Sequence, residues 1–142
     1  MKPFLLVVAP YYTHISAMLV SGASGFFAAK NMAVKTIEVP GALEIPAAIA
    51  LAARTQKYNG YVALGCVIRG ETTHYETVCH ESAHGLMTLS LQGLAIGNGI
   101  VTVENEAQAI VRADPSQGNK GADAAYAAWR LATLAKEFQE AP

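Results

Sequence analysis

One short segment of the chain concentrates residue types that transfer protons and bind anions. Residues 65–76 read GCVIRGETTHYE and contain an arginine, two glutamates, two threonines and a histidine. The apolar run Tyr61–Ile68 leads into this segment, and helical spacing begins at Tyr75. We therefore expect a strand that ends in a polar loop, and a helix that starts from that loop. Backbone N–H groups and the helix dipole favour an anionic ligand at such a position.

His74 stands at the start of the predicted helix and is the leading candidate for proton transfer. An imidazole can give and take protons at neutral pH, and two threonine hydroxyls directly precede this one. The alternative interpretation is a helix-start histidine that only hydrogen-bonds its own loop. The local sequence leaves both interpretations open.

A second motif, HESAH at residues 80–84, matches the zinc-binding pattern HExxH. Two histidines on one helix face can hold zinc with Glu81 as general base, and Glu104 is a candidate third ligand. The pattern has few fixed positions, however, and its helix lies between two predicted strands. His80 and His84 fit an outer or subunit-facing side of the helix equally well. A zinc hydrolase is therefore the least favoured of the functions considered.

The composition predicts one domain that associates with copies of itself. The 142 residues are 52% hydrophobic and only 15% charged, which favours burial of surface between subunits. The net charge of −1 gives no electrostatic case for binding nucleic acid or an anionic membrane. No apolar run is long enough to span a membrane, and the N-terminal segment lacks a small-residue cleavage site. We therefore expect a cytoplasmic protein, with Cys66 and Cys79 as reduced thiols.

Apolar runs and helical spacing alternate along the chain. The predicted strands cover residues 4–9, 34–39, 61–68 and 95–103. The predicted helices cover residues 13–30, capped by Thr13 or Ser16, and then 43–57, 75–92, 105–113 and 122–138. This alternation implies right-handed crossovers and a parallel sheet with helices on both faces.

Polar residues concentrate where the predicted strands end, which is one edge of a parallel sheet. They are Tyr11, Tyr12, His14, Glu44, Arg69 to His74, Glu104, Asn105 and Glu106. The carboxyl edge of an open α/β sheet is its usual ligand site, so this clustering predicts a site there. Glu44 lies between Pro40 and Pro46 in an apolar stretch, which indicates a fixed acceptor for hydroxyl groups such as those of a sugar chain.

One basic residue further along the chain is a candidate phosphate ligand from the residues alone. Arg112 lies near the end of the predicted helix 105–113. Its guanidinium could bind phosphate through paired hydrogen bonds, or it could satisfy the last carbonyls of its own helix. Lys120 lies in the glycine-bearing segment 117–121, which lacks the Lys-Ser/Thr ending of a nucleotide phosphate loop.

Three separated segments resemble the lumazine synthase family in their order and spacing. They are VPGALEIP (residues 39–46), GCVIRGETTHYE (65–76), and Arg112-Ala113 followed by GNKG (118–121). The resemblance runs from Phe4 to Phe138. It implies a flavodoxin-like three-layer α/β/α sandwich with a four-stranded parallel sheet, as a single domain over residues 1–142. It also implies homo-oligomers built from pentamers, which in some members form a closed shell.

The reaction implied by the resemblance joins 5-amino-6-(D-ribitylamino)uracil to 3,4-dihydroxy-2-butanone 4-phosphate. Imine formation, phosphate loss and ring closure give 6,7-dimethyl-8-ribityllumazine, the penultimate step of riboflavin biosynthesis. The resemblance implies no cofactor and no metal. Because the amine and the ketone already react when mixed, the protein mainly needs to orient them. The alternative from another class is a non-catalytic assembly protein that holds lumazine or flavin.

The resemblance also implies roles for individual residues. His74 transfers protons, Glu71 and Thr72 meet the phosphate, and Arg112 binds the phosphate across a subunit boundary with help from Lys120. The positions implied to hold the pyrimidine and its ribityl chain are Tyr11, Ala42, Leu43, Glu44, Cys66, Val67, Ile68 and Asn98.

The chain departs from the family pattern at several of these positions. Leu43 stands where many members have phenylalanine, and Asn98 replaces an aromatic residue that the neighbouring subunit contributes. The sequence Pro10-Tyr11-Tyr12 differs from the commoner Arg-aromatic-Asn, so either tyrosine is a candidate to stack on the pyrimidine. The short segment before Pro10 favours a pentamer or a face-to-face decamer over a shell, although the uninterrupted turn 114–118 would permit a shell.

Overall fold

A single parallel sheet forms the centre of the protein in a computed structural model that describes residues 2–142. Its strands lie in the order β2-β1-β3-β4. They are β1 (Phe4–Val8), β2 (Val34–Glu38), β3 (Gly60–Ile68) and β4 (Ile96–Val103). All neighbouring pairs are parallel, and the β3–β4 register runs from Tyr61 opposite Ile96 to Ile68 opposite Val103. The strands therefore end at a common edge, as predicted.

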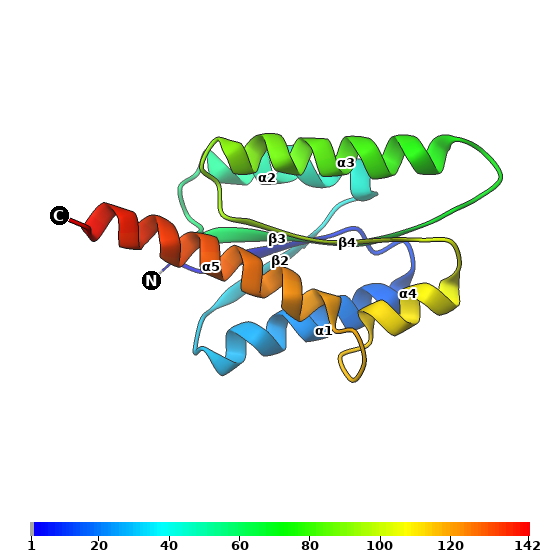
Figure 1. Ribbon diagram of the computed structural model, residues 1–142, viewed down its shortest axis with the longest axis horizontal. Coiled ribbons are helices and arrows are strands. Elements are labelled where there is room, and N and C mark those ends of the chain that lie inside the picture. Colours follow the sequence, from blue (N-terminus) through cyan, green and yellow to red (C-terminus); the bar gives the residue numbers. More distant parts are fainter. Residues whose placement is uncertain (1) are drawn as a thin grey trace.

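Helices cover both faces of the sheet and give three layers (Figure 1). On one face lie α1 (Thr13–Ala29), α4 (Glu106–Ala113) and α5 (Lys120–Glu140). On the other face lie α2 (Ile45–Ala53) and α3 (His74–Leu91). This arrangement confirms the predicted flavodoxin-like α/β/α sandwich. No helix within the described residues is long and apolar enough to cross a membrane.

Strand β1 is buried on both faces, which explains why its sequence is a continuous apolar run. Alternate side chains point to opposite sides of a strand, so Phe4, Leu6 and Val8 join the core beneath α1 and α5. Leu5 and Val7 join the second core, beneath α2 and α3. The sheet is thus held between two hydrophobic cores, and the loops at its carboxyl edge emerge from a rigid base.

Small residues let α5 pack closely on β4 and α1. A side chain at Gly97 would collide with the carbonyl of Ala124 on α5, and one at Gly121 would collide with the carbonyl of Leu19 on α1. Asn119 precedes α5 in the left-handed conformation, with φ of 50°. This close packing fixes the start of α5 and the turn that joins it to α4, so it also fixes the backbone at the candidate phosphate ligand Lys120.

Several predicted helix boundaries need correction. The predicted helix 43–57 is instead a 3₁₀ turn, η1 (Ala42–Glu44), followed by the shorter α2, because Pro46 occupies the first turn of α2. Helix α1 starts at Thr13 without a side-chain cap, and the buried Ser16 hydroxyl donates to the carbonyl of Ala9 at 3.4 Å. Helix α5 starts at Lys120, two residues before the predicted Ala122.

Candidate active site

A pocket of about 490 Å³ opens at the carboxyl edge of the sheet. Its walls come from the loop after β1, from η1, from the end of β3 and from the loop that leads into α3. It contains nine of the sequence-predicted site residues, which are Tyr11, Ala42, Leu43, Glu44, Cys66, Val67, Ile68, Thr72 and His74. Tyr12, the alternative stacking residue, also lines it. Sequence reasoning assigned no role to Ala9, Gly41, Gly70, Tyr75 and Val78, which complete the lining.

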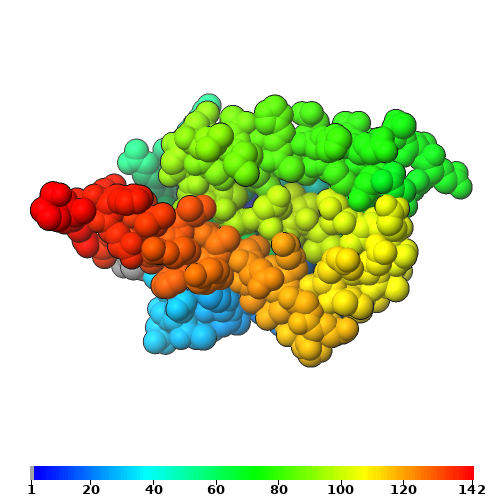
Figure 2. All heavy atoms as spheres, in the orientation of Figure 1, coloured from blue at the N-terminus to red at the C-terminus, as the bar shows by residue number. Residues whose placement is uncertain are grey.

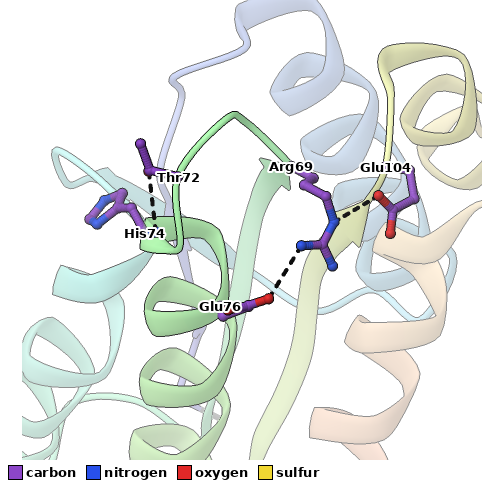
Figure 3. Close-up of polar contacts among 5 residues, drawn as sticks. All are labelled: Arg69, Thr72, His74, Glu76 and Glu104. Carbon is purple, nitrogen blue, oxygen red and sulfur yellow. Dashed lines mark hydrogen bonds and ion pairs between the residues drawn. The ribbon is translucent and has the colours of Figure 1, made fainter.

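His74 begins α3 at the mouth of this pocket. Its backbone N–H donates to the hydroxyl of Thr72 at 3.3 Å, so Thr72 satisfies one of the donors that a helix start leaves free (Figure 3). The His74 side chain is exposed, and no hydrogen bond or ion pair among residues 2–142 engages its imidazole. The ring therefore has no competing partner within the described chain.

The two tyrosines at the end of β1 form an aromatic corner of the pocket. The rings of Tyr11 and Tyr12 lie 4.9 Å apart in an edge-to-face arrangement. Tyr11 is 75% exposed, whereas Tyr12 is half-buried against the first core. Burial is the main cause that raises the pKa of the Tyr12 phenol. The exposed face of Tyr11 is the one that a planar ligand could cover.

Cys66 belongs to the apolar floor of the pocket. The residue is only 8% exposed, and burial, with a smaller contribution from Glu106, raises the pKa of its thiol to about 11. A thiol with this pKa is protonated at neutral pH and is a poor nucleophile. Cys66 therefore contributes shape and apolar surface to the pocket.

Arg69 connects the three elements around the loop before α3, a contact that sequence reasoning missed. Its Nε donates to Glu104 at the end of β4 at 2.8 Å, and its Nη1 donates to Glu76 in α3 at 3.4 Å (Figure 3). The guanidinium also stacks on the ring of Tyr75, 4.4 Å from its centroid. The hydrogen bonds to Glu104 and then Glu76 raise the pKa of Arg69, so the group stays charged.

Four predicted site residues do not line the pocket. Glu71 is exposed in the loop before α3, and Asn98 lies on β4, where its side chain accepts from the backbone N–H of Ile100 at 2.9 Å. Arg112 is exposed on α4 and donates to the carbonyl of Gln108 at 3.0 Å, and Lys120 is exposed at the start of α5. The pocket lining contains no lysine or arginine in the part of the chain that the structure describes.

The loop before α3 and the α4–α5 turn lie apart from each other on the surface (Figure 2). On the face drawn in Figure 2, α4 in yellow lies between the loop before α3 in green and the α4–α5 turn in orange. The α4–α5 turn therefore lies on the other side of α4 from the loop before α3 in this view. Neither candidate phosphate ligand contributes to the pocket of its own chain.

The residues of the HExxH motif are not joined by a third potential zinc ligand within residues 2–142. His80, Glu81 and His84 are exposed on α3, and Glu104 pairs with Arg69 instead. Within residues 2–142, no three histidine, cysteine, aspartate or glutamate side chains are placed to hold a metal ion together. The geometry gives the zinc interpretation no support.

The parallel sheet and the position of the pocket define a flavodoxin-like α/β protein with a small-molecule site at the carboxyl edge of its strands. The family model for 6,7-dimethyl-8-ribityllumazine synthase matches residues 2–136. The chain belongs to this family.

Relatives with that name are similar to the chain over nearly its whole length. The synthases of Novosphingobium aromaticivorans and Zymomonas mobilis are each 56% identical to it, over 97% of this chain and 99% of the relative. The synthase of Sphingopyxis alaskensis is 52% identical, over 97% of this chain and 98% of the relative. The match therefore includes both the pocket and the α4–α5 turn.

Proposed function

We propose that the pocket condenses 5-amino-6-(D-ribitylamino)uracil with 3,4-dihydroxy-2-butanone 4-phosphate to give 6,7-dimethyl-8-ribityllumazine. The observation that carries this proposal is the full-length similarity to synthases of that name. The pocket supports it independently, because it combines an aromatic corner, a carboxylate and an unpaired imidazole in one cavity. The reaction is the penultimate step of riboflavin biosynthesis.

The ribitylaminouracil is assigned to the inner part of the pocket. Its ring stacks on Tyr11 or Tyr12 and lies against the apolar floor at the end of β3. The ribityl hydroxyls donate to Glu44, which η1 presents at the wall of the pocket together with Ala42 and Leu43. Leu43 is 37% exposed, so it offers apolar surface to the ligand.

The phosphate is assigned to the mouth of the pocket, near Thr72 and Glu71. Within residues 2–142 no lysine or arginine lines this pocket, yet a phosphate dianion needs charged donors. Arg112 and Lys120 are exposed elsewhere on the chain. We assign them to the pocket of a neighbouring subunit, so that each site forms between two chains of a pentamer.

The proton transfers are assigned to His74. The first amine attacks the ketone and loses water to form an imine, phosphate then leaves, and the second amine closes the ring with loss of another water. Each step moves a proton between nitrogen, carbon or oxygen atoms, and an imidazole with no competing partner can serve several of them. The protein's larger contribution is orientation of the two substrates.

Large apolar side chains remain exposed on single chains and support the assembly. Leu91 and Met87 on α3 are 82% and 58% exposed, and Phe138 on α5 is 73% exposed. Surfaces of this kind mark contacts between proteins. We assign the protein to the cytoplasm, a compartment compatible with its free thiols Cys66 and Cys79.

A direct assay separates this proposal from the non-catalytic alternative, which no observation favours. Purified protein is mixed with both substrates, and the absorbance of the lumazine product is followed against a protein-free mixture. We expect product to form faster with the protein, with release of inorganic phosphate in equal amount. Equal rates with and without protein would contradict the proposal.

A further inference from the structure

The loop before α3 is held by few contacts besides those of Arg69. The loop residues 70–73 are exposed, and no heavy atom lies within 4 Å of where a side chain at Gly70 would begin. Within this loop, the Thr72 hydroxyl accepts a hydrogen bond from the backbone N–H of His74. The position of the loop therefore depends on its two ends, at Arg69 and at the first turn of α3.

Arg69 joins those two ends through one side chain. Its backbone N–H donates to the carbonyl of Val103 on β4 at 2.9 Å, which fixes the start of the loop. Its guanidinium then reaches Glu76 and Tyr75, which directly follow His74 in α3. Glu104 holds the guanidinium from the side of β4. The Arg69 side chain thus links the first turn of α3 to the end of β4, in addition to the packing of Val78 in the second core.

A lysine could not make this set of contacts. The guanidinium donates in two directions from a planar group and stacks on an aromatic face, whereas an ammonium acts as a compact point charge. An isolated surface ion pair adds little to stability, but one side chain shared by three partners restricts their relative positions. Arg69 does not line the pocket, so its effect reaches the substrates through the loop.

We propose that Arg69 is a positioning residue for His74. It holds the loop and the first turn of α3 so that the imidazole stays at the mouth of the pocket. This inference rests on the proposed function, because its effect is measured on the condensation. The rival explanation is charge: Arg69 offsets Glu76 and Glu104, which would otherwise repel the phosphate.

Steady-state kinetics of Arg69→Lys and Arg69→Met distinguish these explanations. Positioning predicts that both variants lose about 10- to 100-fold in kcat, since small displacements of catalytic groups have effects of this size. The KM for the ribitylaminouracil stays within about twofold of wild type, because its assigned contacts lie on η1 and β3. Wild-type kcat in Arg69→Lys overturns positioning in favour of charge.

Arg130→Met is the matched control. Arg130 donates to Glu137 at 3.1 Å along α5, and its side chain is 41% exposed, close to the 42% of Arg69. We expect Arg130→Met to keep wild-type kcat and to shift Tm by as much as Arg69→Met does. An equal loss of kcat in both variants overturns the inference.

A double-mutant cycle tests whether Arg69 acts through His74. In the His74→Ala background, Arg69→Met should lower kcat by less than about twofold, because the group that it positions is already gone. The same loss in both backgrounds overturns the inference. If Arg69→Met does not fold, Glu104→Ala removes the contact from the β4 side and carries the same two expectations. If the wild-type protein does not condense the substrates, the proposed function is refuted. If the wild-type protein is active and the Arg69 variants keep its kcat, this inference alone is refuted.

Discussion

The pocket wall and the α4–α5 turn carry different parts of the proposed chemistry, and only the pocket wall forms a cavity within one chain. The wall brings together residues from four segments around one space of about 490 Å³. Arg112 on α4 and Lys120 at the start of α5, by contrast, are exposed and do not line that space. One half of the proposed site lies in the pocket wall, and the other half is exposed on α4 and at the start of α5. Under the proposed function, folding of the chain forms the pocket, and association of chains brings the two phosphate ligands to it.

The largest effect is expected for Arg112→Ala, which removes the outward-facing half. Loss of a charge-assisted contact to phosphate is worth about 1.5–3 kcal/mol, or roughly 10- to 150-fold in binding. We expect the KM for the butanone phosphate to rise by that factor while the KM for the pyrimidine stays nearly constant. Initial rates measured against each substrate separately check this. A rise only for the pyrimidine would show that Arg112 does not bind the phosphate.

His74→Ala tests the inward-facing half. General acid–base groups typically contribute about 10²–10⁴-fold, but orientation of the two substrates survives this change, so we expect a loss at or below about 10²-fold in kcat. The imidazole has no partner in the described chain, so the variant should keep its wild-type Tm. Single-turnover rates with both substrates saturating are the measurement. Wild-type turnover would remove His74 from the mechanism.

Coexpression of Arg112→Ala and His74→Ala tests whether the His74 pocket and the phosphate ligand Arg112 of one site come from different chains. In randomly mixed pentamers, about a quarter of the boundaries pair an intact His74 pocket with an intact Arg112 from the neighbour. We therefore expect the mixture to recover about a quarter of wild-type activity, well above either variant alone. A site built within one chain predicts no recovery, because every chain then carries one defect.

The sequence predicted the layers and the pocket more completely than it predicted the contacts between loops. Strands buried on both faces appear as continuous apolar runs, so β1 and β3 were recognisable within one residue of their true ends. The pocket followed from the rule that strand ends of a parallel sheet share one edge. The contact between Arg69 and Glu104 could not be predicted from the sequence. The two residues are 35 positions apart, and only the β3–β4 register brings them together.

Other differences arise from local geometry. Pro46 could have indicated that α2 begins at Ile45, since proline is favoured in the first turn of a helix. The left-handed conformation of Asn119, which sets the start of α5, has no equally clear signal. Whether Arg112 faces its own pocket or another depends on how α4 packs on the sheet, and spacing along the sequence does not fix that.

The molar mass in solution tests whether the protein forms the oligomer that a shared site requires. If the outward half completes a neighbour's site, the protein must be oligomeric, and we expect a pentamer or a face-to-face decamer by multi-angle light scattering. The exposed Leu91 and Met87 on α3 supply apolar surface for such contacts. A mass near that of a closed shell would correct the assembly size. A monomer that still turns over would contradict the shared site.

The smallest expected effect concerns the floor of the pocket. The Cys66 thiol has a pKa of about 11 in the folded protein and an ordinary value of 9.0 when unfolded. Below pH 9 it is protonated in both states. Between pH 9 and 11 the unfolded chain loses this proton first, so the free energy of unfolding falls, by up to about 1.4 kcal/mol per pH unit for one group.

Cys66→Ala should remove this part of the decline, and urea titrations at intervals from pH 7 to 11 measure it. The alanine variant is expected to be less stable at pH 7, since it removes a buried sulfur atom, but its stability should fall more gently above pH 9. Burial also raises the pKa values of Tyr12 and Tyr61, and the contribution of Tyr61 is the same in the two proteins and cancels in the difference. Cys66 adds a smaller part to the upward shift of the Tyr12 pKa, and this part disappears together with the thiol. Parallel stability curves up to pH 11 would show that Cys66 is more accessible to water than the folded chain indicates, and that the floor of the pocket opens in solution.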